Sequence, residues 1–169
     1  MAAAIGHDHR MRRARWVWLA GLVVAEAANA LTPAEVFDKA KDSILVVMVF
    51  DENTELRALG SGVVLPSGRI ATNCHVIEDG TYFRVGRSNQ FVSANLYAAN
   101  SEKDICLLTP NRSIGKSAII RDTQTLRVGE RVYAIGAPEG LELSLSEGLV
   151  SQLRGGLIQT SAPICWCRS

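Results

Sequence analysis

The chain has 169 residues, of which 47% are hydrophobic and 21% are charged, so it can bury the core of about one globular domain. Its formal net charge of +1 lacks the basic excess typical of proteins that bind nucleic acid. Four arginines and two acidic residues precede residue 31, and without that stretch the net charge becomes −1. No nucleic-acid partner is therefore expected.

Residues 1–30 have the three parts of a secretory signal peptide. A basic region is followed by an apolar run over residues 16–25 and then by the small-x-small sequence Ala28-Asn29-Ala30. The apolar run is shorter than the ~20 residues of a membrane-spanning helix, which makes a permanent anchor the lesser alternative. We expect export to the periplasm or to the outside of the cell, cleavage after Ala30, and no stable membrane anchor afterwards. The basic residues are Arg10, Arg12, Arg13 and Arg15.

After this segment the sequence predicts one helix and then strands. Thr32 suits an N-cap, Pro33 suits the first helical position, and Glu35 completes a capping box for a helix that ends near Lys41. Short β-branched or alternating runs separated by Gly and Pro then predict an all-β sandwich or barrel. The expected strands are 43–50, 62–65, 69–73, 81–85, 90–97, 104–109, 131–135, 143–152 and 157–160.

A polar segment at 109–125 divides the strands into two groups. This division favours a double barrel over a single sandwich. The first barrel is expected at about 43–110 and part of a second at about 118–169.

Two residues after the helix could carry chemistry. His75 is the only histidine beyond residue 30 and follows a predicted strand, where a histidine is more often structural or solvated than catalytic. Asp104 stands at the entrance to the apolar run 105–108, where an unpaired carboxylate is costly. An imidazole N–H would be a suitable partner for Asp104. The alternative is that Asp104 caps the turn at residues 102–103.

The four cysteines are Cys74, Cys106, Cys165 and Cys167. Export to an oxidising compartment favours a disulfide. Cys165 and Cys167 flank a tryptophan and could be interpreted as a soft metal site. The chain has no second cysteine pair at ligand spacing, so neither zinc nor another cofactor is expected.

Seven segments occur in an order that resembles one known family. The segments 60–65 and 70–77 contain Gly60-Ser61-Gly62 and the sequence around His75, and 104–108 begins with Asp104. The remaining segments are 126–130, 134–138, 147–151 and 158–164. Together they resemble the trypsin-like serine proteases of the HtrA (Deg) type. The resemblance implies a chymotrypsin-like double β-barrel, a peptidase domain over 31–169, and a protein or peptide substrate.

Within that family, the resemblance assigns His75 as the general base and Asp104 as the residue that orients it. A serine hydroxyl is a poor nucleophile until an imidazole takes its proton, and a carboxylate keeps that imidazole in the correct tautomer. Cys74 precedes the base and Cys106 lies two residues after the acid. We therefore predict a disulfide between them, with two buried free thiols as the alternative.

The resemblance ends after Ile164. The family continues with Pro-Gly-x-Ser-Gly-Gly, whereas residues 165–169 are Cys-Trp-Cys-Arg-Ser. The alignment places Ser169 at the nucleophile and Cys167 at a glycine whose N–H, with that of Ser169, forms the oxyanion hole. A cysteine at that glycine and a C-terminal carboxylate on Ser169 would both oppose catalysis. We expect a frameshift or truncation, an incomplete second barrel, and little or no peptidase activity.

Two alternatives remain open at this stage. One is an exported relative that binds peptides by strand addition without cleaving them, and the other is a small periplasmic structural domain that shares only the scaffold. Retention of both His75 and Asp104 favours the peptidase, while the altered loop at 165–169 favours the binding protein. The sequence carries no signal for oligomeric state.

Overall fold

The computed structural model describes residues 31–137 and 142–164. The predicted signal peptide, Cys165, Cys167 and Ser169 lie outside the described residues. The first described element is α1 (Pro33–Ala40), which has the predicted capping box: the Thr32 side chain accepts from the Glu35 N–H, and the Glu35 carboxylate accepts from the Thr32 N–H at 2.8 Å. A single turn of 3₁₀ helix, η1 (Lys41–Ser43), leads from α1 into the first strand.

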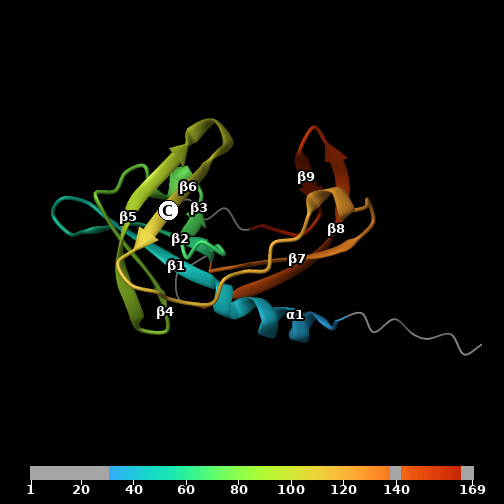
Figure 1. The fold of residues 1–169 in the computed structure, drawn as a ribbon, viewed down its shortest axis with the longest axis horizontal. Coiled ribbons are helices and arrows are strands. Elements are labelled where there is room, and N and C mark those ends of the chain that lie inside the picture. The colour runs from blue at the N-terminus through green and yellow to red at the C-terminus, as the bar shows by residue number, and fades with distance from the viewer. Residues whose placement is uncertain (1–30, 138–141, 165–169) are drawn as a thin grey trace, which may run out of the picture. The chain divides into compact units, whose positions relative to one another are not determined.

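Six antiparallel strands close into a barrel (Figure 1). Their order around the barrel is β1-β2-β3-β6-β5-β4, and pairing of β1 with β4 completes the closure. Closure leaves no unpaired strand edge within this sheet. The strands are β1 (Ile44–Phe50), β2 (Leu56–Val64), β3 (Ile70–Thr72), β4 (Tyr82–Arg87), β5 (Gln90–Asn100) and β6 (Ile105–Pro110).

The core of the molecule lies inside this barrel. Val47, Ile70 and Leu108 are fully buried, and each such side chain contributes about 1.5–3 kcal/mol by leaving water. Gly62 is required where β2 passes these side chains, because a Cβ there would lie 2.5 Å from Cγ2 of Ile70 and 3.0 Å from Cγ2 of Val47. The buried cluster is Leu45, Val47, Val49, Val64, Ile70, Cys74, Ile77, Phe83, Val85, Val92, Ala94, Cys106 and Leu108.

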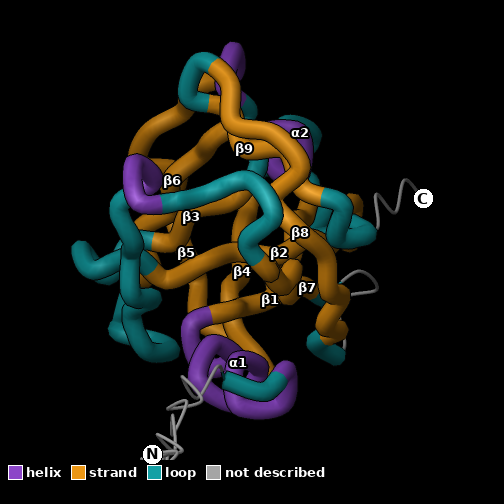
Figure 2. The backbone as a smooth tube through the Cα atoms, turned by 90° about the vertical axis from the view of Figure 1, so that its right-hand side faces the viewer, coloured by secondary structure: helices purple, strands orange, loops and turns teal. Residues whose placement is uncertain are grey.

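A second sheet follows, with the order β7-β8-β9. Its strands are β7 (Arg131–Gly136), β8 (Ser144–Arg154) and β9 (Leu157–Thr160), and among the described residues they form an open sheet. The all-β class with an incomplete second barrel is therefore correct. β7 lies beside β1 and β2 (Figure 2), where the Ala137 N–H donates to Oγ of Ser61 at 2.9 Å.

Several predicted boundaries are wrong. β2 begins at Leu56 and not at residue 62. The first half of this strand lacks a strong strand pattern, but it pairs with β1, and the pairing continues from Val63 back to Leu56. A one-turn helix, α2 (Cys74–Ile77), was not predicted. Asp104 was placed in a strand, but β6 begins one residue later, at Ile105. In the described part of the chain, no helix has the length and apolarity needed to cross a membrane.

Candidate active site

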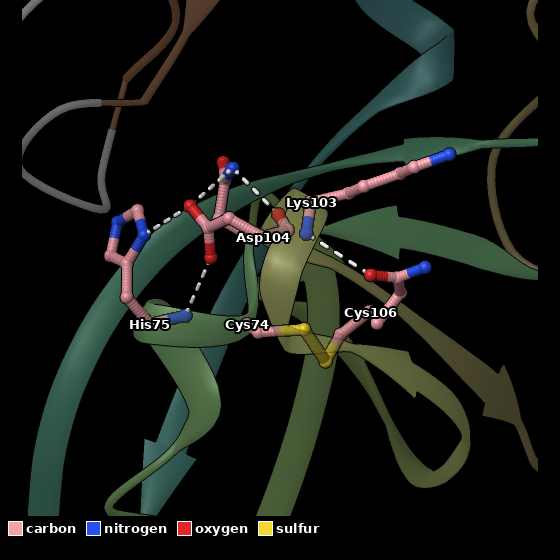
Figure 3. The surroundings of a disulfide bond; sticks show 7 residues. Cys74, His75, Lys103, Asp104 and Cys106 are labelled. Carbon is pink, nitrogen blue, oxygen red and sulfur yellow. Dashed lines mark hydrogen bonds and ion pairs between the residues drawn. A yellow bond between two sulfur atoms is a disulfide. The ribbon is translucent and has the colours of Figure 1, made fainter.

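Pairing of β3 with β6 brings the two predicted chemical residues together. Thr72 at the end of β3 pairs with Cys106 near the start of β6. His75 follows Thr72 by three residues and Asp104 precedes Cys106 by two, so both side chains leave the barrel at the same end. Figure 3 shows the imidazole of His75 and the carboxylate of Asp104 pointing toward one another. The antiparallel register, which joins residues far apart in the sequence, is what creates this site.

His75 contacts Asp104 through two separate groups. Its ring atom Nδ1 lies 2.6 Å from Oδ2 of Asp104, and its backbone N–H donates to Oδ1 at 3.0 Å. The two side chains are 43% and 36% exposed, so this pair lies at the surface of the described residues. With one carboxylate oxygen on the ring and the other on the main chain, the orientation of the imidazole is defined relative to the barrel.

The charge state of Asp104 follows from its donors. The backbone N–H of His75 is the largest influence that lowers the pKa of Asp104, partial burial acts in the opposite direction, and the imidazole and the Asn73 amide lower it further. The carboxyl group is therefore ionised at neutral pH and can only accept hydrogen bonds. In neutral imidazole the proton must then be on Nδ1, which makes Nε2 the nitrogen that can take up a proton.

The local backbone places Asp104 in an uncommon conformation. Asp104 has φ 53° and ψ 41°, in the left-handed region that Asp and Asn tolerate better than most residues. It ends the short 3₁₀ helix η2 (Ser101–Lys103), where its N–H donates to the Ser101 carbonyl at 3.2 Å. Oδ1 of Asn100 accepts from the Lys103 N–H at 3.0 Å at the other end of this turn. This turn directs the carboxylate away from the strand and toward His75.

A disulfide between Cys74 and Cys106 lies directly beneath the pair (Figure 3). The two Cα atoms are 4.9 Å apart, and the cysteines are 9% and 2% exposed. The structure thus contains the predicted bond and not two buried free thiols. Because Cys74 adjoins His75 and Cys106 lies two residues after Asp104, the bond joins the two segments that carry the pair.

Ser169 and Cys167 lie outside the described residues, so the nucleophile and the oxyanion hole stay predictions. Among residues 31–137 and 142–164, no group of three or more His, Cys, Asp or Glu side chains could hold a metal ion. Asn73, two positions before His75, carries no functional signal in the sequence. The structure shows its side-chain amide donating to Asp104 at 3.0 Å.

The closed antiparallel barrel, the second antiparallel sheet and the histidine–aspartate pair at the end of the barrel have the arrangement expected of a trypsin-like peptidase domain with an incomplete second barrel. The family model of the trypsin-like peptidase domain matches residues 60–169. The chain therefore belongs to the trypsin-like peptidase family.

Within this family, the chain is similar to proteases of the DegP (HtrA) type. It is 36% identical over 127 residues to "Probable serine protease do-like" of Buchnera aphidicola subsp. Acyrthosiphon pisum, covering 68% of this chain and 27% of that protein. It is 34% identical over 126 residues to "Periplasmic serine endoprotease DegP" of Escherichia coli strain K12, covering 67% of this chain and 27% of that protein. The chain spans about a quarter of the length of these curated relatives.

Proposed function

We propose that this chain carries the general base and the orienting acid of a serine endopeptidase. The observation that supports the proposal is the 2.6 Å contact between Nδ1 of His75 and Oδ2 of an ionised Asp104. In this role, Nε2 of His75 takes the proton from a serine hydroxyl while that oxygen attacks the peptide carbonyl. It then returns the proton to the leaving amine. Asp104 stabilises the imidazolium that forms between these two steps.

The proposed nucleophile is Ser169. Its position relative to Ile164 is that of the family's serine, and the proposed oxyanion donors are the backbone N–H groups of Cys167 and Ser169. Cys167 occupies a position at which the family has glycine, and a side chain there opposes the backbone turn that such a hole requires. We propose for this reason that the sequence at 165–169 supports little peptidase activity.

Export is the second part of the proposal. Residues 1–30 would act as a signal peptide, and residues 31–169 would form the peptidase domain in the periplasm or outside the cell. Two features support this: the basic and apolar pattern of the first thirty residues, and the similarity to relatives such as the periplasmic serine endoprotease DegP of E. coli. Protein or peptide substrates follow from the proposed endopeptidase chemistry.

A chimera tests the catalytic assignment. Residues 1–164 would be joined to a segment of a DegP-type relative that contains the family's Gly-x-Ser-Gly-Gly loop and the strands that follow it. We expect this chimera to cleave casein, and we expect Asp104→Asn to reduce kcat by about 10,000-fold, since an amide no longer favours the required tautomer. The residual cleavage by Asp104→Asn still requires His75 as the base, so His75→Ala should abolish it.

Two results would contradict the assignment. Equal casein cleavage by the chimera with and without His75→Ala would remove His75 from the mechanism. A folded chimera that binds unfolded casein but does not cleave it would favour the non-catalytic peptide-binding alternative. Exposed Asn95→Ala in the same chimera is the control for substitution as such, and it should leave kcat unchanged.

A further inference from the structure

The amide nitrogen of Asn73 makes two hydrogen bonds to a single residue, Asp104. This Nδ2 atom donates to the main-chain carbonyl of Asp104 at 3.1 Å and to the carboxylate oxygen Oδ2 at 3.0 Å. A carbonyl and an ionised carboxylate can only accept, so the nitrogen of the Asn73 amide, and not its oxygen, must face them. An amide nitrogen has two hydrogens, and this arrangement provides an acceptor for each.

These two bonds act on different degrees of freedom of Asp104. The bond to the carbonyl stabilises a main chain with φ 53°, a conformation that costs free energy for a residue other than glycine. The bond to Oδ2 opposes rotation of the carboxylate about its Cβ–Cγ bond. Oδ2 is also the oxygen that contacts Nδ1 of His75, so the same atom receives the amide of Asn73 and the imidazole.

The position of Asn73 in the chain supports a role outside its own helix. Asn73 is the N-cap of α2, where an asparagine side chain ordinarily accepts a hydrogen bond from the N–H two or three residues later. No such side-chain bond is present in α2. The local capping bond is absent, while both bonds of the amide nitrogen reach a residue 31 positions away in the sequence.

We propose that Asn73 is a positioning residue that orients the Asp104 carboxylate and thereby selects the Nδ1–H tautomer of His75. The inference rests on the proposed function, in which His75 is the general base. Without the two amide donors, the carboxylate can rotate and the main chain of Asp104 loses a contact that stabilises its left-handed conformation. Nδ1–H then loses its aligned acceptor, and the imidazole spends more time as the Nε2–H tautomer, which cannot take a proton from serine.

The tautomer can be measured directly by NMR on the full chain. Imidazole ¹⁵N shifts, detected through the carbon-bound ring protons at alkaline pH, distinguish the two neutral tautomers, and His75→Ala identifies the signals among the three histidines. We expect the Nδ1–H form to predominate. Asn73→Asp, which has the same shape but no donors and adds a carboxylate beside Asp104, should lower the ratio of Nδ1–H to Nε2–H about tenfold or more. Asn73→Ala should lower it in the same direction.

Asn95→Asp is the matched control, because Asn95 is an exposed asparagine on β5 and the substitution adds the same charge. It should leave the tautomer ratio unchanged. In the casein-cleaving chimera, Asn73→Asp should reduce kcat by about 10- to 100-fold with KM unchanged.

Two outcomes would overturn the proposal. One is an unsubstituted chain in which His75 is mainly the Nε2–H tautomer, a result that needs no variant to fold. The other is a folded Asn73→Asp chain with the original tautomer ratio, even if its thermal stability is lower, because that pattern belongs to a purely structural residue. The tautomer is read without substrate or nucleophile. If the chimera is inactive or its activity is independent of His75, the proposed function fails while the positioning result stands.

Discussion

The barrel and the second sheet both contain apolar strand residues but bury them to different extents. In the barrel, Val47 and Leu108 have no exposed surface, and the six strands pair around a complete circuit. In the second sheet, Leu157 is 77% exposed and Ile158 is 46% exposed, although Val150 is 1% exposed. A strand pattern therefore produces a buried core only where the sheet closes or another layer covers it. This difference predicts that the stability of the described residues comes mainly from the barrel.

The largest difference in stability should appear when one leucine in each region is truncated to alanine. Leu108→Ala removes a fully buried side chain from the barrel, and we expect the free energy of unfolding to fall by about 2–5 kcal/mol. Leu157→Ala removes a side chain that is already mostly in water, and we expect a change within about 0.5 kcal/mol. Urea unfolding of both variants measures the difference. Equal losses would show that the second sheet contributes to stability as the barrel does.

Loss of the disulfide, which joins two segments of the barrel, should lower the stability of the chain by a similar amount. Cys74 and Cys106 are separated by 32 positions, and loss of this link should lower the free energy of unfolding by about 3–4 kcal/mol in the chain-entropy model. The double variant Cys74→Ala with Cys106→Ala should show this loss under non-reducing conditions. The same variant should be insensitive to dithiothreitol, whereas the parent chain should be destabilised by it. A parent chain with unchanged stability after complete reduction would contradict the prediction.

A smaller effect is expected at the contact between the two regions. Oγ of Ser61 accepts from the Ala137 N–H at 2.9 Å. Ser61→Ala removes that acceptor, and we expect a loss of about 1 kcal/mol in urea unfolding. Exposed Ser93→Ala on β5 is the control, with an expected change near zero. A Ser61→Ala chain as stable as the control would mean that the two regions are held together by other contacts.

The smallest expected effect is the pH-dependent contribution of Asp42, next to β1, to the stability of the fold. Hydrogen bonds from Lys116, and then from Arg87, lower the pKa of Asp42 from 3.8 to about 2. A carboxylate with a lowered pKa in the folded state stabilises the fold above its ordinary pKa, and this contribution is lost as the pH falls toward about 2. The Asp42 side chain is 31% exposed, so solvent screens its ion pairs, and the contribution is small and decreases with salt.

Asp42→Asn tests this dependence. Relative to the parent chain, the variant should be less stable at pH values above about 4 and should lose less stability between about pH 4 and pH 2. Acid titration of the unfolding midpoint at low and high salt measures both features. If the unfolding midpoints of the two chains change in parallel across this pH range, Asp42 does not contribute to the acid dependence of stability.

Local sequence patterns predicted the class of the fold but not the pairing of residues at the site. The Thr32 and Glu35 capping box, the apolar run of β1 and most strand segments along the chain were predictable, because caps and strand periodicity depend on neighbours in the chain. The pairing of His75 with Asp104 was predictable from resemblance to a family, since the separate residues had several equally good uses.

Other features depended on contacts that no local pattern contains. The early start of β2 was decided by pairing with β1, and the Asp104 backbone was decided by its place at the end of η2. Asn73 is the clearest case. The sequence alone determined a polar residue at the end of a predicted strand, two positions before His75. Only the tertiary structure decided that its amide binds Asp104, because the antiparallel register of β3 and β6 brings together two segments about 30 residues apart.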